Sequence, residues 1–207
     1  MSKPPLCIDI DNVIAQTDLV IRQVIREYTG GRVNLSYRHI LDFDYPKCCD
    51  ARGQHISVEE WHTVHKLFSR PPWIMSVKPY PSIQNILRRL SEHYELHIAT
   101  SRLADARKAT VEWLDEHSFP PHRLHFLMRG EKHLLLGGLQ TAIEDDPVQA
   151  VEFEASGQRC YVLAHPWNRH VPSGLFIQRI RNWAAIERAL LPADRHHTKT
   201  KIERGAN

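Results

Sequence analysis

The stretch Leu6-Cys7-Ile8-Asp9-Ile10-Asp11-Asn12-Val13-Ile14-Ala15 is an apolar run that contains two aspartates two residues apart. Apolar residues on both sides of an acid predict a strand that is buried on both faces, and such strands belong to parallel sheets covered by helices. Ligands of these folds bind at the carboxyl ends of the strands. Because two neighbouring carboxylates repel each other, Asp9 and Asp11 require a cation or a proton. The stretch therefore predicts a metal site, an acid/base site, or both.

The size and composition of the chain predict one sizeable core with an insertion, since 207 residues include 42% hydrophobic and 25% charged ones. The net charge of +3 is small, so no nucleic-acid polymer is indicated as a partner. No apolar run is long enough to span a membrane, and no apolar signal segment precedes the first strand. Cys7, Cys48, Cys49 and Cys160 lack C-x-x-C spacing, which favours reduced thiols. We expect a cytoplasmic protein.

The segment that follows the first strand has the pattern of helices. Residues 19–28 carry apolar side chains at helical spacing. Residues 57–60 form a capping box that begins a second helix, and residues 70–72 end it with two prolines. The sequence therefore predicts a small helical cap, residues 15–79, inserted after the first strand.

From Glu95 onward, short apolar runs alternate with helical patterns, as in β-α-β units. The expected strands cover residues 96–99, 124–128, 140–143 and 159–163, and the expected helices cover 104–117, 148–155 and 176–191. With the first strand, they predict an α/β fold, a doubly wound parallel sheet of five strands with helices on both faces. This core comprises residues 1–14 and 80–191, and a disordered basic tail, residues 192–207, follows it.

Polar groups recur where these strands end, and such ends share one edge of a parallel sheet. Hydrolysis of a phosphate monoester is very slow without catalysis and would use all of these groups. A hard, oxygen-liganded cation such as Mg²⁺ suits the acids that follow the first and fourth strands, Asp9, Asp11, Glu144 and Asp145.

Each remaining group has a predicted role in this reaction. Asp9 is the candidate nucleophile, and Asp11 is the candidate group that protonates the leaving oxygen and later deprotonates water. Thr100 and Ser101, together with nearby backbone N–H groups, are candidates for binding phosphate oxygens. Lys132 would add positive charge.

These residues resemble the four ordered motifs of the haloacid dehalogenase superfamily, over about residues 6–147. The motifs are Asp9-Ile10-Asp11-Asn12-Val13, Thr100-Ser101, Lys132 and Glu144-Asp145. The resemblance implies a Rossmann-like core, Asp9 as nucleophile and Asp11 as acid/base, and the second aspartate points to the phosphatase branch. The helical insertion, Thr100-Ser101-Arg102 and Ile143-Glu144-Asp145-Asp146-Pro147 are similar to the 5'(3')-deoxyribonucleotidases and related bacterial 5'-nucleotidases. Where nucleotidases often have two aspartates, this chain has Glu144-Asp145, and Asp145 ranks first as direct metal ligand.

Several residues have competing interpretations. Lys108 is the rival of Lys132, although a lysine on a helix is usually a solvated charge. Thr100 or Ser101 alone is typical of a helix cap. Arg102 joins them as a candidate phosphate ligand. Trp73 is the candidate for substrate contact among the aromatic residues of the cap, and Arg169 is predicted to reach the crevice after the fifth strand.

The sequence thus predicts a magnesium-dependent phosphomonoesterase that acts through an aspartyl-phosphate on Asp9. The expected substrate is a small-molecule phosphate ester, in the first place a (deoxy)nucleoside monophosphate cleaved by a 5'-nucleotidase reaction. Two alternatives stay open, a phosphatase of another small metabolite such as a sugar phosphate, and a binding protein without catalytic activity. A homodimer is also left open.

Overall fold

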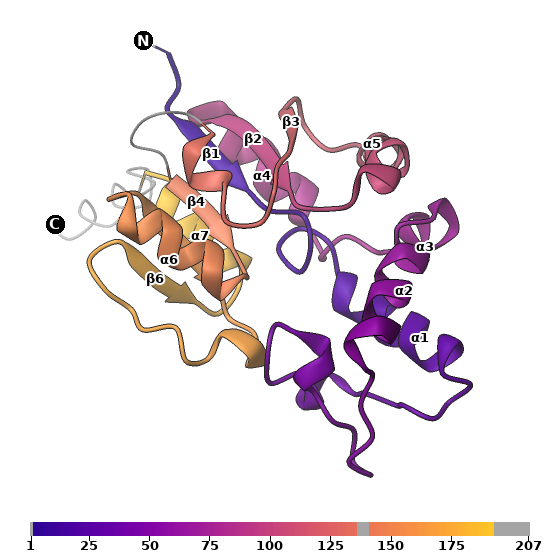
Figure 1. The fold of residues 1–207 in the computed structure, drawn as a ribbon. Helices are drawn as coiled ribbons and strands as arrows, with labels where there is room; N and C mark the ends of the chain where they lie inside the picture. The colour runs from indigo at the N-terminus through magenta and orange to yellow at the C-terminus, as the bar shows by residue number, and fades with distance from the viewer. Residues whose placement is uncertain (1, 136–140, 193–207) are drawn as a thin grey trace, which may run out of the picture.

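The computed structural model describes residues 2–135 and 141–192, and the described residues form a six-stranded sheet at its centre (Figure 1). All the strands run parallel, in the order β3-β2-β1-β4-β5-β6. The strands are β1 Pro5–Ile8, β2 Glu95–Thr100, β3 Arg123–Phe126, β4 Thr141–Glu144, β5 Arg159–Leu163 and β6 Ile177–Ile180. The predicted parallel α/β sheet is confirmed.

Strand β1 lies in the middle of the sheet because its side chains are apolar on both faces. Leu6, Cys7 and Ile8 are fully buried, with Leu6 and Ile8 in the hydrophobic cluster on one face and Cys7 in the cluster on the other. The strand pairs with β2 on one side and with β4 on the other. The residues that follow β1 therefore emerge between the ends of β2 and β4.

The prediction of five strands missed β6, which pairs with β5 at the edge of the sheet. The predicted final helix over residues 176–191 is therefore wrong at its start. Helix α7 begins at Trp183, because the Asn182 side chain accepts a hydrogen bond from the Ala185 N–H at 3.0 Å and caps the helix there. Ile177 and Ile180 are three residues apart, a spacing that also fits one face of a helix.

Helices cover both faces of the sheet. Helices α4 and α7 pack against each other behind the sheet in Figure 1, and α6 lies in front of it. Ile86 and Leu90 of α4 and Ile186 of α7 belong to the larger hydrophobic cluster, whereas Phe153 of α6 belongs to the smaller one. The bounds of the helices outside the insertion are α4 Ile83–His93, α5 Arg107–Glu116, α6 Pro147–Ala155 and α7 Trp183–Leu190.

The chain between β1 and α4 leaves the sheet and returns to it at one place. The Gln16 N–H donates to the Lys78 carbonyl at 2.8 Å, and the Tyr80 N–H donates to the Ile14 carbonyl at 2.9 Å. We call the enclosed segment, residues 16–78, the helical lobe, and its helices lie to one side of the sheet in Figure 1. Its elements are α1 Thr17–Tyr28, η1 Tyr37–His39, η2 Tyr45–Lys47, α2 Val58–Phe68 and α3 Pro71–Ser76. The division into a cap domain and a core domain remains a prediction.

The capping box predicted at the start of the second helix is present, whereas the prolines expected to end that helix also begin the short helix α3. The Glu60 N–H donates to the Ser57 hydroxyl at 3.1 Å and the Ser57 N–H donates to the Glu60 carboxylate at 2.9 Å, so the capping box begins α2. Residues 193–207 of the predicted tail and Gln140 lie outside the described residues. Within the described part of the chain, no helix has the length and apolar character needed to cross a membrane.

Candidate active site

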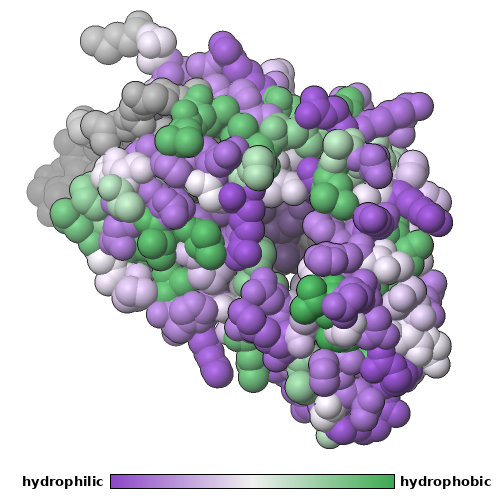
Figure 2. Space-filling model, viewed as in Figure 1, coloured by the Kyte–Doolittle hydropathy of each residue, from purple (hydrophilic) through white to green (hydrophobic). Residues whose placement is uncertain are grey.

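The carboxyl ends of β1 to β4 surround one cavity of about 250 Å³ between the sheet and the helical lobe. Figure 2 shows a hollow in the surface at the junction of these two parts. Polar residues from all four strand ends line the cavity, namely Asp9, Asp11, Ser101, Arg102, Lys132, Glu144 and Asp145. The convergence expected at one edge of a parallel sheet is therefore present.

The loop after β1 has a fixed shape. Asn12 adopts a left-handed conformation with φ of 58°, which asparagine tolerates better than most residues. Its side-chain oxygen accepts a hydrogen bond from the Asp18 N–H at 2.7 Å at the start of α1. The Trp183 indole N–H donates to the Val13 carbonyl at 2.7 Å. The loop that carries Asp9 and Asp11 is thereby tied to both the lobe and the core.

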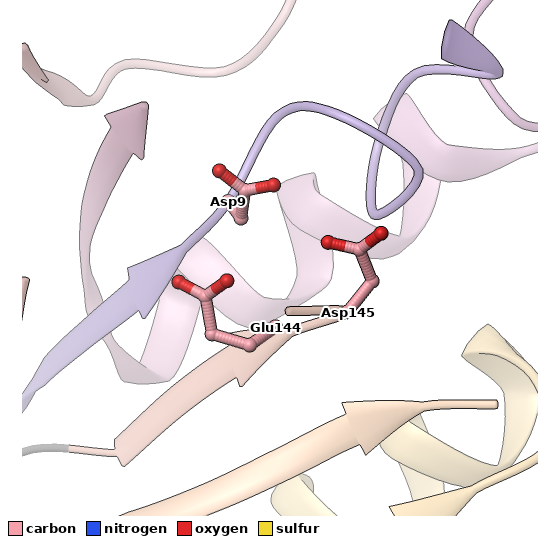
Figure 3. A group of neighbouring side chains, drawn as sticks. All are labelled: Asp9, Glu144 and Asp145. Carbon is pink, nitrogen blue, oxygen red and sulfur yellow. The ribbon is translucent and has the colours of Figure 1, made fainter. Parts of the chain in front are cut away.

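Three acids at the ends of β1 and β4 gather at the floor of the cavity (Figure 3). Asp9, Glu144 and Asp145 each offer an oxygen within 4.8 Å of the others, and all three side chains are buried. Lys132 Nζ lies 2.6 Å from Asp9 Oδ1 and 2.9 Å from Glu144 Oε1. One ammonium group thus faces two of three carboxylates.

Burial raises the pKa of Asp9 to about 6, with Lys132 opposing the rise and Asp11 adding to it. Burial also raises the pKa of Glu144 to about 8, again against the effect of Lys132. The pKa of Asp145 is raised well above its usual range by burial and by the charges of Asp9 and Glu144. Ionised together, these carboxylates require further positive charge.

The donor set formed by Asp9, Glu144 and Asp145 fits a hard divalent cation. All of its ligand atoms are carboxylate oxygens, and Glu144 Oε2 is buried without a hydrogen-bond partner among the described residues. Asp146, the next acid in the chain, is not part of this group. Its Oδ1 accepts from the Val148 N–H at 2.9 Å as the cap of α6, and both of its oxygens bind Arg129.

Asp11 was a predicted metal ligand, but its carboxylate lies outside the group of three acids and has other partners. Its Oδ1 lies 2.7 Å from Arg102 Nη2 and 2.6 Å from the Thr17 hydroxyl. Burial would raise the pKa of Asp11, but the Arg102 charge and the hydrogen bonds from Arg102 and Thr17 hold it below its usual value. In this state Asp11 is an ionised carboxylate facing a guanidinium.

The predicted phosphate ligands after β2 occupy different positions. Thr100 is fully buried and its hydroxyl accepts from the Arg102 N–H at 3.2 Å, so it shapes the turn and is not among the described residues that line the cavity. Ser101 lines the cavity, and its hydroxyl is buried without a partner in the described part of the chain. Ser101 is therefore the better placed of the two hydroxyls.

The two candidate lysines are also placed differently. Lys132 is 2% exposed and contacts Asp9 and Glu144, whereas the Lys108 side chain is 89% exposed and lies 3.7 Å from Glu112 on its own helix. Of the two, only Lys132 lines the cavity.

Trp73 and Arg169 do not line the cavity in the described structure. Trp73 is half-buried in α3 and packs against the hydrophobic core, and Arg169 is exposed after the 3₁₀ turn η5 Pro166–Asn168. Trp167 takes the place expected of Arg169, since it lines the cavity and its indole N–H donates to Asp145 Oδ2 at 3.2 Å.

The sequence did not single out the aromatic wall of the cavity as a unit. The lobe contributes Phe43, Tyr45, Trp61, His65 and Phe68 to the lining. Tyr45 stacks on Trp61 with ring centroids 4.9 Å apart, and Trp61 stacks on His65 at 5.4 Å. Trp61 and Phe68 have the helical spacing that predicts helix core residues. Phe43 and Tyr45 lie in irregular sequence, where no pattern marks them as cavity residues.

Comparison with known proteins identifies relatives along almost the whole chain. Residues 3–196 match the family described as "5' nucleotidase, deoxy (Pyrimidine), cytosolic type C protein". A Staphylococcus epidermidis protein named "Putative 5'(3')-deoxyribonucleotidase" is 23% identical over 189 residues, which cover 90% of this chain and 96% of the relative. A Chlorobaculum tepidum protein of the same name is 31% identical over 116 residues, 53% of this chain and 52% of the relative.

Solved structures also share the fold. A haloacid dehalogenase-like hydrolase from Streptococcus pneumoniae superposes with a TM-score of 0.64 at 12% identity, covering 91% of this chain and 99% of that one.

Proposed function

The chain belongs to this 5'-nucleotidase family of haloacid dehalogenase phosphatases, and from that premise we propose that it is a magnesium-dependent 5'-nucleotidase of (deoxy)nucleoside monophosphates. The observation that carries the proposal is the group of three buried carboxylates with Lys132 at the floor of an aromatic-walled cavity. An acidic floor fits a cation and a phosphate, and an aromatic wall fits a flat ring.

In the proposed first step, an Asp9 oxygen attacks the phosphorus atom of the ester. A bond forms between Asp9 and phosphorus, and the bond between phosphorus and the nucleoside oxygen breaks. Lys132, at 2.6 Å from Asp9, orients the carboxylate and offsets its charge. When bound, a divalent cation held by Asp9, Glu144 and Asp145 would neutralise the charge that otherwise keeps carboxylate and phosphate apart.

Asp11 gives its proton to the leaving oxygen in the same step. Arg102 now keeps Asp11 ionised, so Asp11 takes up that proton only after the guanidinium has turned away. The arriving phosphate is an anion and competes with Asp11 for Arg102, in keeping with the predicted role of Arg102 as a phosphate ligand. Binding of the substrate phosphate to Arg102 and protonation of Asp11 are then coupled.

In the second step, Asp11 removes a proton from water, whose oxygen attacks phosphorus and releases Asp9. Inorganic phosphate leaves and Asp9 is again a free carboxylate. Asp11 keeps the proton from water until Arg102 returns to it, and that proton then passes to solvent, which restores the ionised pair. The Ser101 hydroxyl, which has no other partner in the described structure, donates to a phosphate oxygen. This division of work needs both aspartates of the first motif.

The aromatic wall supports a nucleotide over a sugar phosphate. Phe43, Tyr45, Trp61 and Phe68 face the cavity from the lobe, and flat rings favour stacking with a nucleobase. The proposed binding partner is therefore the substrate itself, a small-molecule phosphate ester. We also propose a cytoplasmic location, which the four unpaired cysteines support.

The test is phosphate release by the purified protein with Mg²⁺ and, separately, with a chelator. The substrates are nucleoside 5'- and 3'-monophosphates in ribo and deoxy forms, sugar phosphates and p-nitrophenyl phosphate. We expect release that requires Mg²⁺ and is fastest with a nucleotide. Faster turnover of a sugar phosphate would contradict the substrate class, and no release from any ester by folded protein would contradict the activity.

A further inference from the structure

Six buried side-chain polar atoms have no hydrogen-bond partner within the described residues, and three of them belong to residues that line the catalytic cavity. These three are Ser101 Oγ, Glu144 Oε2 and Gln149 Nε2. The hydroxyl and the carboxylate have roles in the proposed reaction. The glutamine amide has none.

The orientation of the Gln149 amide is fixed by its other end. The Gly130 N–H donates to Gln149 Oε1 at 2.9 Å, and since an N–H needs an acceptor, the atom that it contacts is the oxygen. The amide nitrogen is therefore the free end, and Gln149 is 1% exposed. Two N–H donors are thus held in a buried position beside the cavity.

Gln149 lines the cavity from the core and not from the helical lobe. It is in the first turn of α6, three residues after the Asp146 cap, and α6 packs against η4 Lys132–Leu134. The aromatic wall comes instead from the lobe. The amide therefore lies on the same side of the cavity as Lys132 and the acids, which also come from the core.

A buried donor without an acceptor costs stability, so a site that keeps one favours a ligand that brings the acceptor. An amide N–H cannot bind a cation, because it has no lone pair to offer, but it complements an anionic oxygen. We propose that Gln149 is a further substrate-binding residue, whose Nε2 donates a hydrogen bond to an oxygen of the phosphoryl group. The inference rests on the proposed function and adds a residue to it.

Gln149→Glu separates the two ends of the amide. The glutamate keeps an oxygen for the Gly130 N–H and removes the donor, whereas Gln149→Met removes both at similar size. Gln158→Met is the matched control, because Gln158 is also buried and lies outside the cavity, where its Nε2 donates to the His133 carbonyl at 2.8 Å. Thermal unfolding of each variant reports its stability.

The measurements are the Kd of inorganic phosphate by calorimetry with Mg²⁺ present, and the KM and kcat of the best substrate. Loss of a hydrogen bond to a charged group should weaken phosphate binding and raise KM about tenfold to a hundredfold in both Gln149 variants. Because Gln149→Met adds no charge, agreement between the two variants assigns the loss to the donor. Gln158→Met should lower stability alone.

Phosphate affinity and KM equal to those of the wild type in a folded Gln149 variant would overturn the inference while leaving the phosphatase activity in place. If the wild type instead hydrolyses no ester, the proposed function fails. The calorimetric comparison then still tests Gln149, and a wild-type protein that binds no phosphate would overturn the inference as well.

Discussion

His165 should make the stability of this protein fall steeply in mild acid. The imidazole is buried between the core and the lobe, where it stacks on Trp167 with ring centroids 4.3 Å apart. Its Nε2 donates to the Asn12 carbonyl at 2.8 Å, so its Nδ1 accepts from the Tyr37 hydroxyl at 2.8 Å. A neutral ring satisfies both partners. A protonated ring would place an N–H where the Tyr37 hydroxyl now donates.

Burial, together with the charge of Arg179, lowers the pKa of His165 to about 4, against the hydrogen bond with Asn12. In the unfolded chain its pKa is about 6.5, so the unfolded state binds the proton first as the pH falls. The stabilisation is complete above pH 6.5 and is lost as the pH falls towards 4. At about 1.4 kcal/mol for each pKa unit, the loss is about 3 kcal/mol in all, and about 2 kcal/mol of it occurs by pH 5.

The assay is urea unfolding of the wild type and of His165→Gln at pH 7, 6 and 5, in a chelator so that metal binding does not contribute. Glutamine does not titrate, so the difference between the two free energies of unfolding should shrink by about 2 kcal/mol from pH 7 to pH 5. His170→Gln, a change at an exposed histidine of the same loop, should leave that dependence unchanged. A difference that stays constant from pH 7 to pH 5 would refute the assignment of a neutral, buried imidazole.

Three further predictions concern the cavity. Lys132→Met should abolish phosphate release and lower stability more at pH 8 than at pH 6 in urea unfolding, because at pH 6 Glu144, with a pKa of about 8, is mostly protonated and Asp9, with a pKa of about 6, is half protonated. An equal loss at both pH values would argue against the pairing. Mg²⁺ should raise the Tm more at pH 8 than at pH 6, since the raised pKa values of Asp9 and Glu144 make protons compete with the metal; a Tm shift independent of pH would contradict this. Arg129 and Asp146 both line the cavity, so Arg129→Lys, which loses the paired hydrogen bonds of 2.6 and 2.8 Å to Asp146, should disturb the shape of the cavity. In steady-state kinetics, KM should rise about tenfold with little effect on kcat. An unchanged KM would exclude Arg129 from shaping the cavity.

The sequence was enough to predict which polar residues converge at one edge of the sheet, because the carboxyl ends of parallel strands follow a simple rule. An apolar run that ends in acids marks a buried strand, and parallel strands bring their carboxyl ends together whatever their distance along the chain. Asp9, Lys132 and Glu144 meet in this way although Asp9 and Lys132 are 123 residues apart. No knowledge of side-chain packing was required.

The hydrogen-bond partners of Asp11 could be identified only from the folded structure. Arg102 was expected beside a phosphate, and in the structure its guanidinium contacts the Asp11 carboxylate. The sequence gives the charge of each group but not which of two acceptors the arginine contacts. The same limit applies to Gln149, whose free amide is evident only once Gly130 is seen to bind the other end.

The aromatic wall depended on how the lobe folds over the sheet. Trp73 and Trp61 both lie in helical sequence, and nothing in the periodicity tells which faces the cavity. The structure places Trp61 there and packs Trp73 against the core. Side chains of an insertion are oriented by its contacts with the rest of the protein, which sequence spacing does not encode.

The central claim is that Asp9 forms the bond to phosphorus, and trapping that bond tests it most directly. The wild-type enzyme is mixed with Mg²⁺ and its best substrate, quenched in acid during turnover and treated with borohydride, which reduces a phosphorylated aspartate to homoserine. Peptide mass spectrometry then locates the change. Homoserine at position 9, absent without substrate and absent in Asp9→Asn, is the predicted result. Turnover with no reduced aspartate, or with the change at another acid, would contradict the account.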